Sequence, residues 1–398
     1  HSGFFTPLNA LFESMSGFSS TGATVLQDFE GLPKSMFLYR AFTQWVGGIG
    51  IIVIFIAVFP ALAIAGRQLF FTEVPGPNEE RITPRLRNTA TTLMAVYGGL
   101  TLACWLSYGL AGMSLFDALA HALTTVSAGG FSTNALSFQG TPGGLIDWVA
   151  IVFMFLSGVN FTLQYRVFSG RPGLLRSDPE FRAYGLVVLV SALLLTLTLL
   201  GTYGAAGAIR HGLFQALSIV TTTGFASADF DLWGNRPQVV LLVLMFIGGS
   251  AGSAAGGVKV VRWLILLQHS GREVQRALHP RAVLPVRLGR KVVPEEVVRA
   301  VAAFITLYVL LFGIGTVLLA ALGSDFVTAF TASIAAIGNI GPGLEGVGPM
   351  LNYTEIHPLG RAFLIFQMYA GRLEVVSVFV LFTSSWWRLP RRNPWRQQ

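Results

Sequence analysis

The chain has 398 residues, of which 53% are hydrophobic and only 12% are charged. An average soluble domain carries about twice that share of charged residues, and a disordered chain is far more polar. A soluble chain of this length could not bury so much apolar surface. The single cysteine, Cys104, excludes a disulfide framework and a cysteine-ligated zinc site. The composition therefore predicts a protein that crosses a membrane several times.

Apolar segments of two lengths alternate along the chain. A membrane-spanning helix needs roughly 20 mostly apolar residues. Segments of that length occupy residues 39–65, 89–109, 146–165, 184–200, 238–267 (interrupted by glycines), 297–322 and 359–387. Four shorter segments lie among them, at residues 7–19, 115–127, 212–221 and 325–337. Short apolar segments are typical of re-entrant helices, so we expect four half-helices, with Asp117 and Asp325 as N-caps of two of them.

The basic residues sort to one side of the membrane if the four short segments enter and leave on the same face. One side then holds 20 of the 27 basic residues: Arg67, Arg81, Arg85, Arg87, Arg166, Arg171, Arg176, Arg182, Arg262, Arg272, Arg276, Arg281, Arg287, Arg290, Lys291, Arg299, Arg388, Arg391, Arg392 and Arg396. The other side holds Lys34, Arg40, Arg210, Arg236 and Arg361. The positive-inside rule makes the first side cytoplasmic. This placement explains the net charge of +8 without nucleic acid.

A glycine-containing run follows each short segment. The runs are STGATV (20–25), AGGFST (128–133), TTGFAS (222–227) and NIGPGL (339–344). Their aligned glycines, separated by 108, 94 and 117 residues, are Gly22, Gly130, Gly224 and Gly341. Self-similarity at a nearly constant spacing indicates an internal repeat. We therefore predict an all-α membrane protein of four fused helix–pore loop–helix units.

The repeats set the expected domain boundaries. Repeat 1 covers residues 1–66, repeat 2 covers 67–168, repeat 3 with its broken inner helix covers 169–270, a cytoplasmic linker covers 271–293, and repeat 4 with a basic tail covers 294–398. His1 lies just before the first half-helix, so the outer helix expected in repeat 1 is missing from this sequence. Either a truncated chain or further residues before His1 would explain its absence.

The composition of the four runs indicates which ion they suit. Irregular backbone at membrane depth is stable only where it is buried in protein or lines water. Four such loops around an axis form a ring of carbonyl oxygens that can replace the hydration shell of a cation. The half-helices end at the loops with their partly negative C-termini, which favours cations. No run contains a carboxylate, which favours a dehydrated monovalent ion over a divalent one.

These runs, together with WVGGIGIIVI (45–54), GGSAGSAAGGVKVVR (248–262) and YAGRLEVVSVFVLF (369–382), resemble the TrkH/TrkG/KtrB family of potassium-uptake proteins over essentially the whole chain. The resemblance implies a pseudo-fourfold, K⁺-channel-like pore for which K⁺ is the transported ion. The implied filter residues are Thr21, Gly22, Gly129, Gly130, Thr223, Gly224, Ile340 and Gly341, with Ser20, Ala128, Thr222 and Asn339 as the next layer. In related plant transporters a serine at the first filter glycine accompanies sodium preference, so Gly22 favours potassium.

The glycine-rich stretch GGSAGSAAGG (248–257) interrupts a predicted span. Each glycine costs a helix about 1 kcal/mol relative to alanine. The stretch is either a flexible kink that eases packing or an unwound loop in the conduction path, and the resemblance favours a barrier below the filter. The expected gate residues are Gly248, Gly249, Gly252, Gly256, Gly257, Lys259 and Arg372. Lys259 is equally compatible with a gate cation and with a side chain that reaches the cytoplasmic surface.

Arg372 lies near the middle of the predicted span 359–387, where a charge costs at least about 3 kcal/mol. Glu374 follows two residues later and points to a different helix face, so it is a poor partner for Arg372. Our hypothesis is that Arg372 donates hydrogen bonds to carbonyls of residues 248–257 and adds an electrostatic barrier to cations. The alternative is a structural arginine that ties two helices together.

Other polar residues receive simpler interpretations. Glu13 either binds a neighbouring backbone donor or attracts cations to the outer mouth, and the structural role is favoured. Asn160 and Gln164 are candidates to line the cavity. The six histidines lack metal-ligand spacing, and no catalytic constellation is present, so we predict no enzymatic activity.

The basic stretch 269–296 is the longest polar connection and by default faces anionic lipid headgroups. The resemblance further implies a bacterial inner membrane location, a homodimer, and a cytosolic TrkA-like nucleotide-binding regulatory ring, so that nucleotide binds only through that partner. Three alternatives stay open. They are a sodium-preferring or H⁺- or Na⁺-coupled relative of the same architecture, a secondary transporter built from two related halves, and a non-conducting receptor.

Overall fold

The computed structural model describes residues 6–62, 82–141, 144–289 and 291–383. The expected basic side chains at 67, 81, 290 and 388–396 lie outside these residues. The helices are α1 (Pro7–Phe18), α2 (Lys34–Leu62), α4 (Ile82–Leu110), α5 (Leu115–Val126), α6 (Gly144–Ser157), α7 (Phe161–Phe168), α8 (Gly173–Ser177), α9 (Pro179–Val220), α10 (Asn235–Leu244), α11 (Val260–Leu278), α12 (Glu295–Ala321), α13 (Phe326–Ile337), α14 (Pro358–Arg372) and α15 (Val375–Leu381). Short 3-10 turns lie at Ser137–Gly140, Phe230–Trp233, Glu345–Val347 and Tyr353–Glu355, and the two-residue strands β1 (Arg287–Leu288) and β2 (Lys291–Val292) pair antiparallel.

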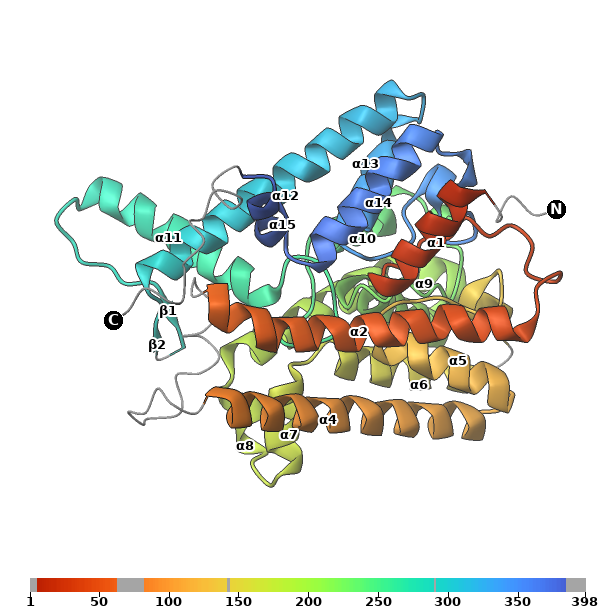
Figure 1. Cartoon of the computed structure of the whole chain (residues 1–398), viewed down its shortest axis with the longest axis horizontal. Helices are drawn as coiled ribbons and strands as arrows, with labels where there is room; N and C mark the ends of the chain where they lie inside the picture. The colour runs from red at the N-terminus through yellow and green to blue at the C-terminus, as the bar shows by residue number, and fades with distance from the viewer. Residues whose placement is uncertain (1–5, 63–81, 142–143, 290, 384–398) are drawn as a thin grey trace, which may run out of the picture.

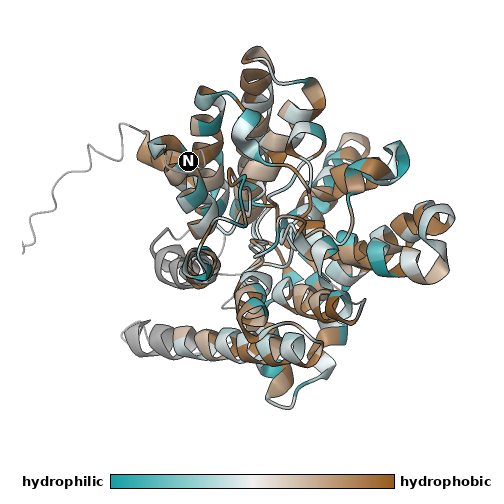
Figure 2. Cartoon of the chain, turned by 90° about the vertical axis from the view of Figure 1, so that its right-hand side faces the viewer, coloured by the Kyte–Doolittle hydropathy of each residue, from teal (hydrophilic) through white to brown (hydrophobic). Residues whose placement is uncertain are grey.

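The lengths and apolar composition of the described helices agree with the predicted all-α membrane protein. Within the described residues, three helices are long and apolar enough to cross a membrane, or up to five if each sharply bent pair counts as one span. The exposed apolar residues of α9 recur at helical spacing, as lipid-facing side chains do: Leu186, Leu189, Leu193 and Leu197. Viewed along the long axis, the helices surround a centre that is filled by loops (Figure 2).

Three of the four predicted half-helices form separate helices, namely α1, α5 and α13. Asp325 caps α13 as expected, because its carboxylate accepts hydrogen bonds from the amides of Val327 and Thr328. The predicted N-cap Asp117 is wrong. Ser114 caps α5 instead, and its hydroxyl accepts from the Asp117 amide at 3.1 Å.

The third half-helix and its outer span are two helices that meet at a kink inside α9. Helix α9 runs from Pro179 to Val220 and joins the two predicted segments 184–200 and 212–221. The joint lies at Gly204, whose backbone has a φ of 66° and a ψ of 176°. Glycine tolerates this conformation, so the chain turns there without a long loop.

Two predicted spans are wrong as continuous helices. Helices α6 and α7 meet at 102°, and α14 and α15 meet at 112°. Asn160 caps α7 by accepting from the amides of Thr162 and Leu163, while the buried amide of Gln164 donates to the carbonyls of Leu156 and Val159. These two side chains, expected to line the cavity, satisfy the backbone groups that the break leaves unpaired.

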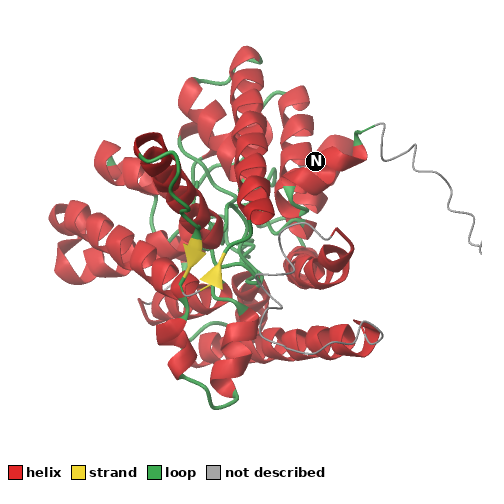
Figure 3. Ribbon diagram, turned by 90° about the vertical axis from the view of Figure 1, so that its left-hand side faces the viewer, coloured by secondary structure: helices red, strands yellow, loops and turns green. Residues whose placement is uncertain are grey.

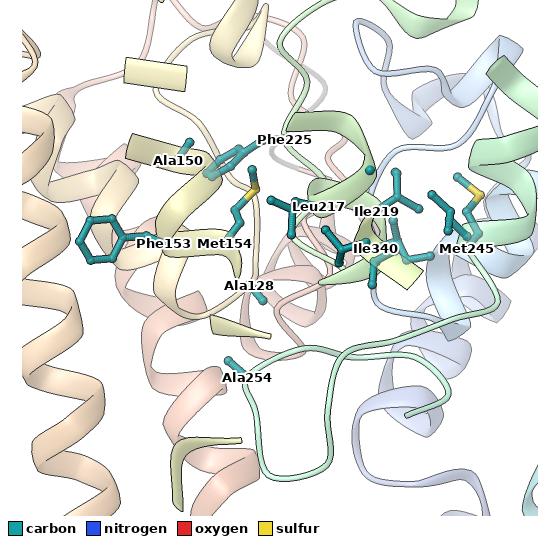
Figure 4. Packing of buried hydrophobic residues seen from close by; sticks show 14 of the residues in the cluster. Ala128, Ala150, Phe153, Met154, Leu217, Ile219, Phe225, Met245, Ala254 and Ile340 are labelled. Atoms are coloured by element: carbon teal, nitrogen blue, oxygen red, sulfur yellow. The ribbon is translucent and has the colours of Figure 1, made fainter. Parts of the chain in front are cut away.

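The largest apolar core joins the repeats around the central loops. Leu217 and Ile219 of α9 lie with Ile340 in the middle of Figure 4, with Met245 on one side and Phe153 and Met154 of α6 on the other. All six side chains are buried. The two short strands lie beside α11, at the end of the molecule away from α1 and α5 (Figures 1 and 3). The central loops are packed in the core between these two ends.

Candidate pore and gate

The four glycine runs share one backbone conformation. Two residues after the last residue of each half-helix comes a residue with positive φ that is not glycine: Ser20 (52°), Ala128 (53°), Thr222 (58°) and Asn339 (53°). Two residues later comes the aligned glycine, again with positive φ: Gly22 (84°), Gly130 (78°), Gly224 (78°) and Gly341 (101°). The same conformation therefore occurs four times, although the sequences of the runs differ.

A repeated hydrogen bond closes each half-helix. The amide of the residue between the two positive-φ positions donates to a carbonyl five residues earlier, at 2.9 Å in every repeat: Thr21 to Ser16, Gly129 to Thr124, Thr223 to Ser218 and Ile340 to Ala335. This 6→1 bond and a left-handed residue before it are the Schellman ending of a helix. Glycine usually occupies the left-handed position, and other residues lose about 1–2 kcal/mol there, so surrounding contacts must hold these loops in place.

The four glycines lie against one another in a closed ring. A Cβ atom on Gly22 would overlap the carbonyl oxygen of Gly129, and one on Gly130 would overlap that of Thr223. The series continues from Gly224 to the oxygen of Ile340 and from Gly341 to the oxygen of Thr21. Each loop thus abuts the carbonyl of the next repeat, in the order 1, 2, 3, 4 and back to 1. The expected filter residues come together around one centre, and a cavity of about 120 Å³ touches all four glycines.

Different side chains brace the four loops, from the same position in three repeats and from the neighbouring position in the fourth. The residue nine places before the aligned glycine is Glu13, His121, Gln215 or Ala332. Glu13 accepts from the Thr24 hydroxyl at 3.0 Å and the Val25 amide at 3.1 Å. His121 contacts the Ser132 hydroxyl at 3.1 Å, and Gln215 donates to the Phe225 carbonyl at 3.2 Å. In repeat 4 the neighbouring Thr331 accepts from the Leu344 amide at 3.0 Å.

Two side chains make the ring asymmetric. The Gln44 amide donates to the Gly129 carbonyl at 2.6 Å, and the Gln44 carbonyl oxygen accepts from the Phe131 amide at 3.0 Å. The Tyr353 hydroxyl donates to the Gly341 carbonyl at 2.6 Å. A carbonyl oxygen has two lone pairs, so each of these oxygens keeps one acceptor site. The composition of the runs gave no sign of either contact, because both donors lie outside the runs.

The stretch 248–257, here called the intramembrane loop, is a compact hydrogen-bonded structure. Its two ends are joined by bonds from Gly248 to the Val258 carbonyl at 2.8 Å and from Val260 to the Gly249 carbonyl at 3.2 Å. Its middle docks on the break between α6 and α7, through Ser250 to Gly158 and Ala254 to Ser157, with Phe161 donating back to Gly252. The break in α6–α7 thus provides the docking edge, which explains why the loop is ordered without helix.

The intramembrane loop contacts the layer of the ring that contains Ser20, Ala128, Thr222 and Asn339. The Gly256 amide donates to the Thr222 hydroxyl at 2.6 Å. Arg372, only 7% exposed, donates to the Ala254 carbonyl at 3.0 Å and to the Ser20 hydroxyl at 3.2 Å. A charged guanidinium therefore bridges the loop and the first repeat at the base of the ring.

The sequence placed Arg372 near the middle of a continuous span, and this prediction is wrong. It is the last residue of α14, at the 112° bend. Glu374 pairs instead with Arg262 at 2.6 Å. Lys259 occupies the N-cap position of α11 and its ammonium donates to the Ala255 carbonyl, so this cation turns back to the intramembrane loop.

The family model described as "TrkH: Cation transport protein" matches residues 1–389 of the chain. This chain belongs to the TrkH family of cation transport proteins. Relatives include the Trk system potassium uptake protein TrkH of Vibrio parahaemolyticus, which is 40% identical over 96% of this chain and 79% of its own length. The TrkH and TrkG proteins of Escherichia coli are 39% and 38% identical, over 96% of this chain and 80% and 79% of their own lengths.

A solved TrkH structure has the same fold. The crystal structure of the potassium transporter TrkH from Vibrio parahaemolyticus matches with a TM-score of 0.87 and 38% identity, covering 96% of this chain and 80% of that one. The TrkH family consists of transport proteins and not of enzymes. The sequence-based recognition of the family and the predicted all-α, pore-loop fold class are therefore confirmed.

Sequence reasoning missed several residues that hold the ring and the loop in this TrkH-family chain. They are Gln44, Arg40, Ser157, Gly158 and Glu180. The short polar interruption SGVN (157–160) in an apolar span was a usable signal for the break. No comparable signal marked Gln44 or Glu180, whose partners are 85 and 71 residues away in the sequence.

Proposed function

We propose that this chain is the K⁺-translocating subunit of a Trk-type uptake system. The observation that carries the proposal is the closed ring in which each aligned glycine abuts the carbonyl of the next repeat. Its relatives are named as potassium uptake proteins over nearly the whole of this chain. Potassium uptake is the activity that these relatives support for this chain, and the geometry supports the following assignment of its parts.

The proposed selectivity filter consists of backbone carbonyls. Its members are the predicted filter residues Thr21, Gly22, Gly129, Gly130, Thr223, Gly224, Ile340 and Gly341, with Ser20, Ala128, Thr222 and Asn339 below them. Carbonyl oxygens held at fixed spacing replace water around a dehydrated monovalent cation. Positive φ at alternate positions allows consecutive carbonyls to turn toward one axis, which supports this role for the strained loops.

The proposed gate is the intramembrane loop, with Gly248, Gly249, Gly252, Gly256 and Gly257 permitting its irregular path. The loop lies against Thr222 and Arg372 at the base of the ring. Arg372 adds positive charge in a water-poor site, where it opposes the passage of a cation. Opening then requires the loop to leave Arg372 and Thr222.

We further propose that the cytoplasmic end receives a regulatory partner and that the protein acts as a homodimer in the bacterial inner membrane. Helix α11, the β1–β2 hairpin and the start of α12 form one unit there. Arg272 binds both carboxylate oxygens of Glu295, at 2.6 and 2.8 Å. Such a bidentate pair fixes α11 to α12, so a TrkA-like nucleotide-binding ring could move them together. The basic side chains beside it suit anionic lipid headgroups.

The test is labelled-rubidium uptake into proteoliposomes, driven by a membrane potential without a proton or sodium gradient. We expect the wild-type chain to take up rubidium under these conditions, and Arg372→Ala to raise the rate about tenfold because a charged hydrogen bond that holds the loop is lost. Arg276→Ala is the matched control, since Arg276 is an exposed cytoplasmic arginine. Uptake that requires a proton or sodium gradient would identify a coupled transporter and overturn the channel mechanism.

A further inference from the structure

Glu180 connects the start of α9 to the intramembrane loop. One oxygen of its carboxylate accepts from the amide of Ala251 at 2.7 Å and from the amide of Val261 at 3.3 Å. Ala251 belongs to the intramembrane loop, and Val261 lies in the first turn of α11. The loop is thus held from a second direction, in addition to Arg372 and Thr222.

The chemistry of this contact makes it stronger than an ordinary loop hydrogen bond. The first amides of a helix have no partner within the helix and carry partial positive charge. The Glu180 carboxylate accepts from one such amide, that of Val261, and from the loop amide of Ala251. Bonds to a charged acceptor are roughly twice as strong as neutral ones. Glu180 is half-buried, so water competes only in part. One side chain therefore fixes the distance between the loop and the helix that follows it.

The backbone of Glu180 is itself held firmly. Asp178 caps α9 by accepting from the Phe181 amide at 2.8 Å, and Pro179 occupies the first helical position. The turn of the β1–β2 hairpin lies beside this helix start, because a Cβ on Gly289 would be 3.5 Å from the Pro179 ring. A displacement of the hairpin would therefore reach Glu180 through the adjacent Pro179.

A cavity of about 180 Å³ adjoins the contact, between the hairpin and the intramembrane loop. Glu180, Ala251 and Val261 line it together with Leu288 and Lys291 of the hairpin. This space lets Glu180 swing away from the loop without displacing a packed core. Arg372 has no comparable freedom, since it is buried between the loop and the ring.

We propose that Glu180 is a positioning residue that latches the intramembrane loop in its closed state, and that the latch is released from the cytoplasmic end. This inference rests on the proposed role of the loop as the gate. Glu180 does not touch the filter, so it changes how often the pore is open and leaves the choice of ion unaltered.

The experiment compares rubidium uptake by four purified variants in proteoliposomes: Glu180→Gln, Glu180→Asp, Glu355→Gln and Arg372→Ala. We expect Glu180→Gln to raise uptake about tenfold, because the glutamine oxygen accepts the same two bonds without charge, and neutral bonds are about half as strong. Glu180→Asp keeps the charge with a shorter reach and should raise uptake less. Glu355→Gln is the control, because it makes the same chemical change at an exposed carboxylate in the short 3-10 turn Tyr353–Glu355.

Selectivity provides the second readout. The ratio of K⁺ to Na⁺ competition should be unchanged in Glu180→Gln, whereas general damage to the pore would lower it. Size-exclusion profiles establish whether each variant is folded. If Glu180→Gln is not folded, the uptake of Glu180→Asp tests the latch. The same uptake in Glu180→Gln as in wild type, with faster uptake in Arg372→Ala, would overturn the latch and leave the gate standing. No increase in either variant would overturn the proposed gate itself.

Discussion

At the scale of single residues, the buried ion pair between Glu13 and Arg40 is the main support of the first pore loop. The two side chains are each 4% exposed and their charged atoms are 2.5 Å apart. Glu13 also binds the loop itself, through Thr24 and Val25, and the Arg40 guanidinium lies 4.0 Å from the ring centre of Phe131. The structural interpretation of Glu13 therefore has more support than attraction of cations at the mouth.

Removing one member of this pair should be costly. Glu13→Gln leaves the Arg40 charge buried without its partner, and such a change costs about 3–5 kcal/mol. We expect a clear drop in the thermal unfolding temperature in detergent, and a smaller drop when Arg40→Gln is added. Glu273 is itself 47% exposed, and its one buried partner, Arg272, keeps its pair with Glu295, so Glu273→Gln should cost less than about 1 kcal/mol. Equal unfolding temperatures for Glu13→Gln and Glu273→Gln would contradict this account.

The sequence predicted the glycines of the ring but not the residues that hold it. Gly22 and its three counterparts stand out because a turn at membrane depth needs them. Ser20, Ala128, Thr222 and Asn339 adopt left-handed backbone without being glycine, which no local pattern reveals. Asn339 shows the reason: its amide donates to Thr21, 318 residues away, and to the Met368 carbonyl. Contacts between repeats stabilise these residues, and a single sequence contains no record of them.

At the scale of elements, the sequence predicted the broken inner helix of repeat 3 and missed the other two breaks. Ten consecutive residues of Gly, Ala and Ser, at 248–257, indicate the interruption in repeat 3. The break between α6 and α7 takes only three residues within an apolar span, and α14 and α15 are separated by Leu373 and Glu374 alone. Hydropathy averaged over a span cannot detect so short an interruption. These missed bends supply the docking edge of the intramembrane loop and the position of Arg372.

The close packing of α14 on α13 gives a prediction at this scale. A Cβ on Gly371 would overlap the carbonyl oxygen of Ile337, so Gly371→Ala forces the two helices apart. We expect a loss of about 1–3 kcal/mol in the free energy of unfolding, measured by denaturation in detergent. Gly313→Ala on α12 is the control, because a Cβ there meets open space. It should be neutral or stabilising by up to about 1 kcal/mol, and a similar loss in both variants would contradict the packing argument.

At the scale of the whole molecule, four unlike sequences build one ring. The repeats share the half-helix, its left-handed ending and the aligned glycine, while the bracing residue differs in each. A single chain can therefore place a different polar group behind every loop, which identical subunits cannot do. The intramembrane loop belongs to repeat 3 alone, and contacts with repeats 1, 2 and 4 hold it against the base of the ring.

The central claim is that this ring is a carbonyl filter for potassium, and competition in rubidium uptake tests it most directly. The proteins to compare are wild type, Gly22→Ser and Gly99→Ser, each competed separately with K⁺, Na⁺ and Li⁺. A serine at Gly22 would have a φ of 84° and overlap the Gly129 carbonyl. A Cβ on Gly99 meets open space.

We predict that K⁺ competes and Na⁺ does not in wild type and Gly99→Ser. In Gly22→Ser the preference should fall at least about tenfold, since left-handed backbone strain of 1–2 kcal/mol displaces the carbonyls. An unchanged preference in folded Gly22→Ser would contradict the carbonyl filter.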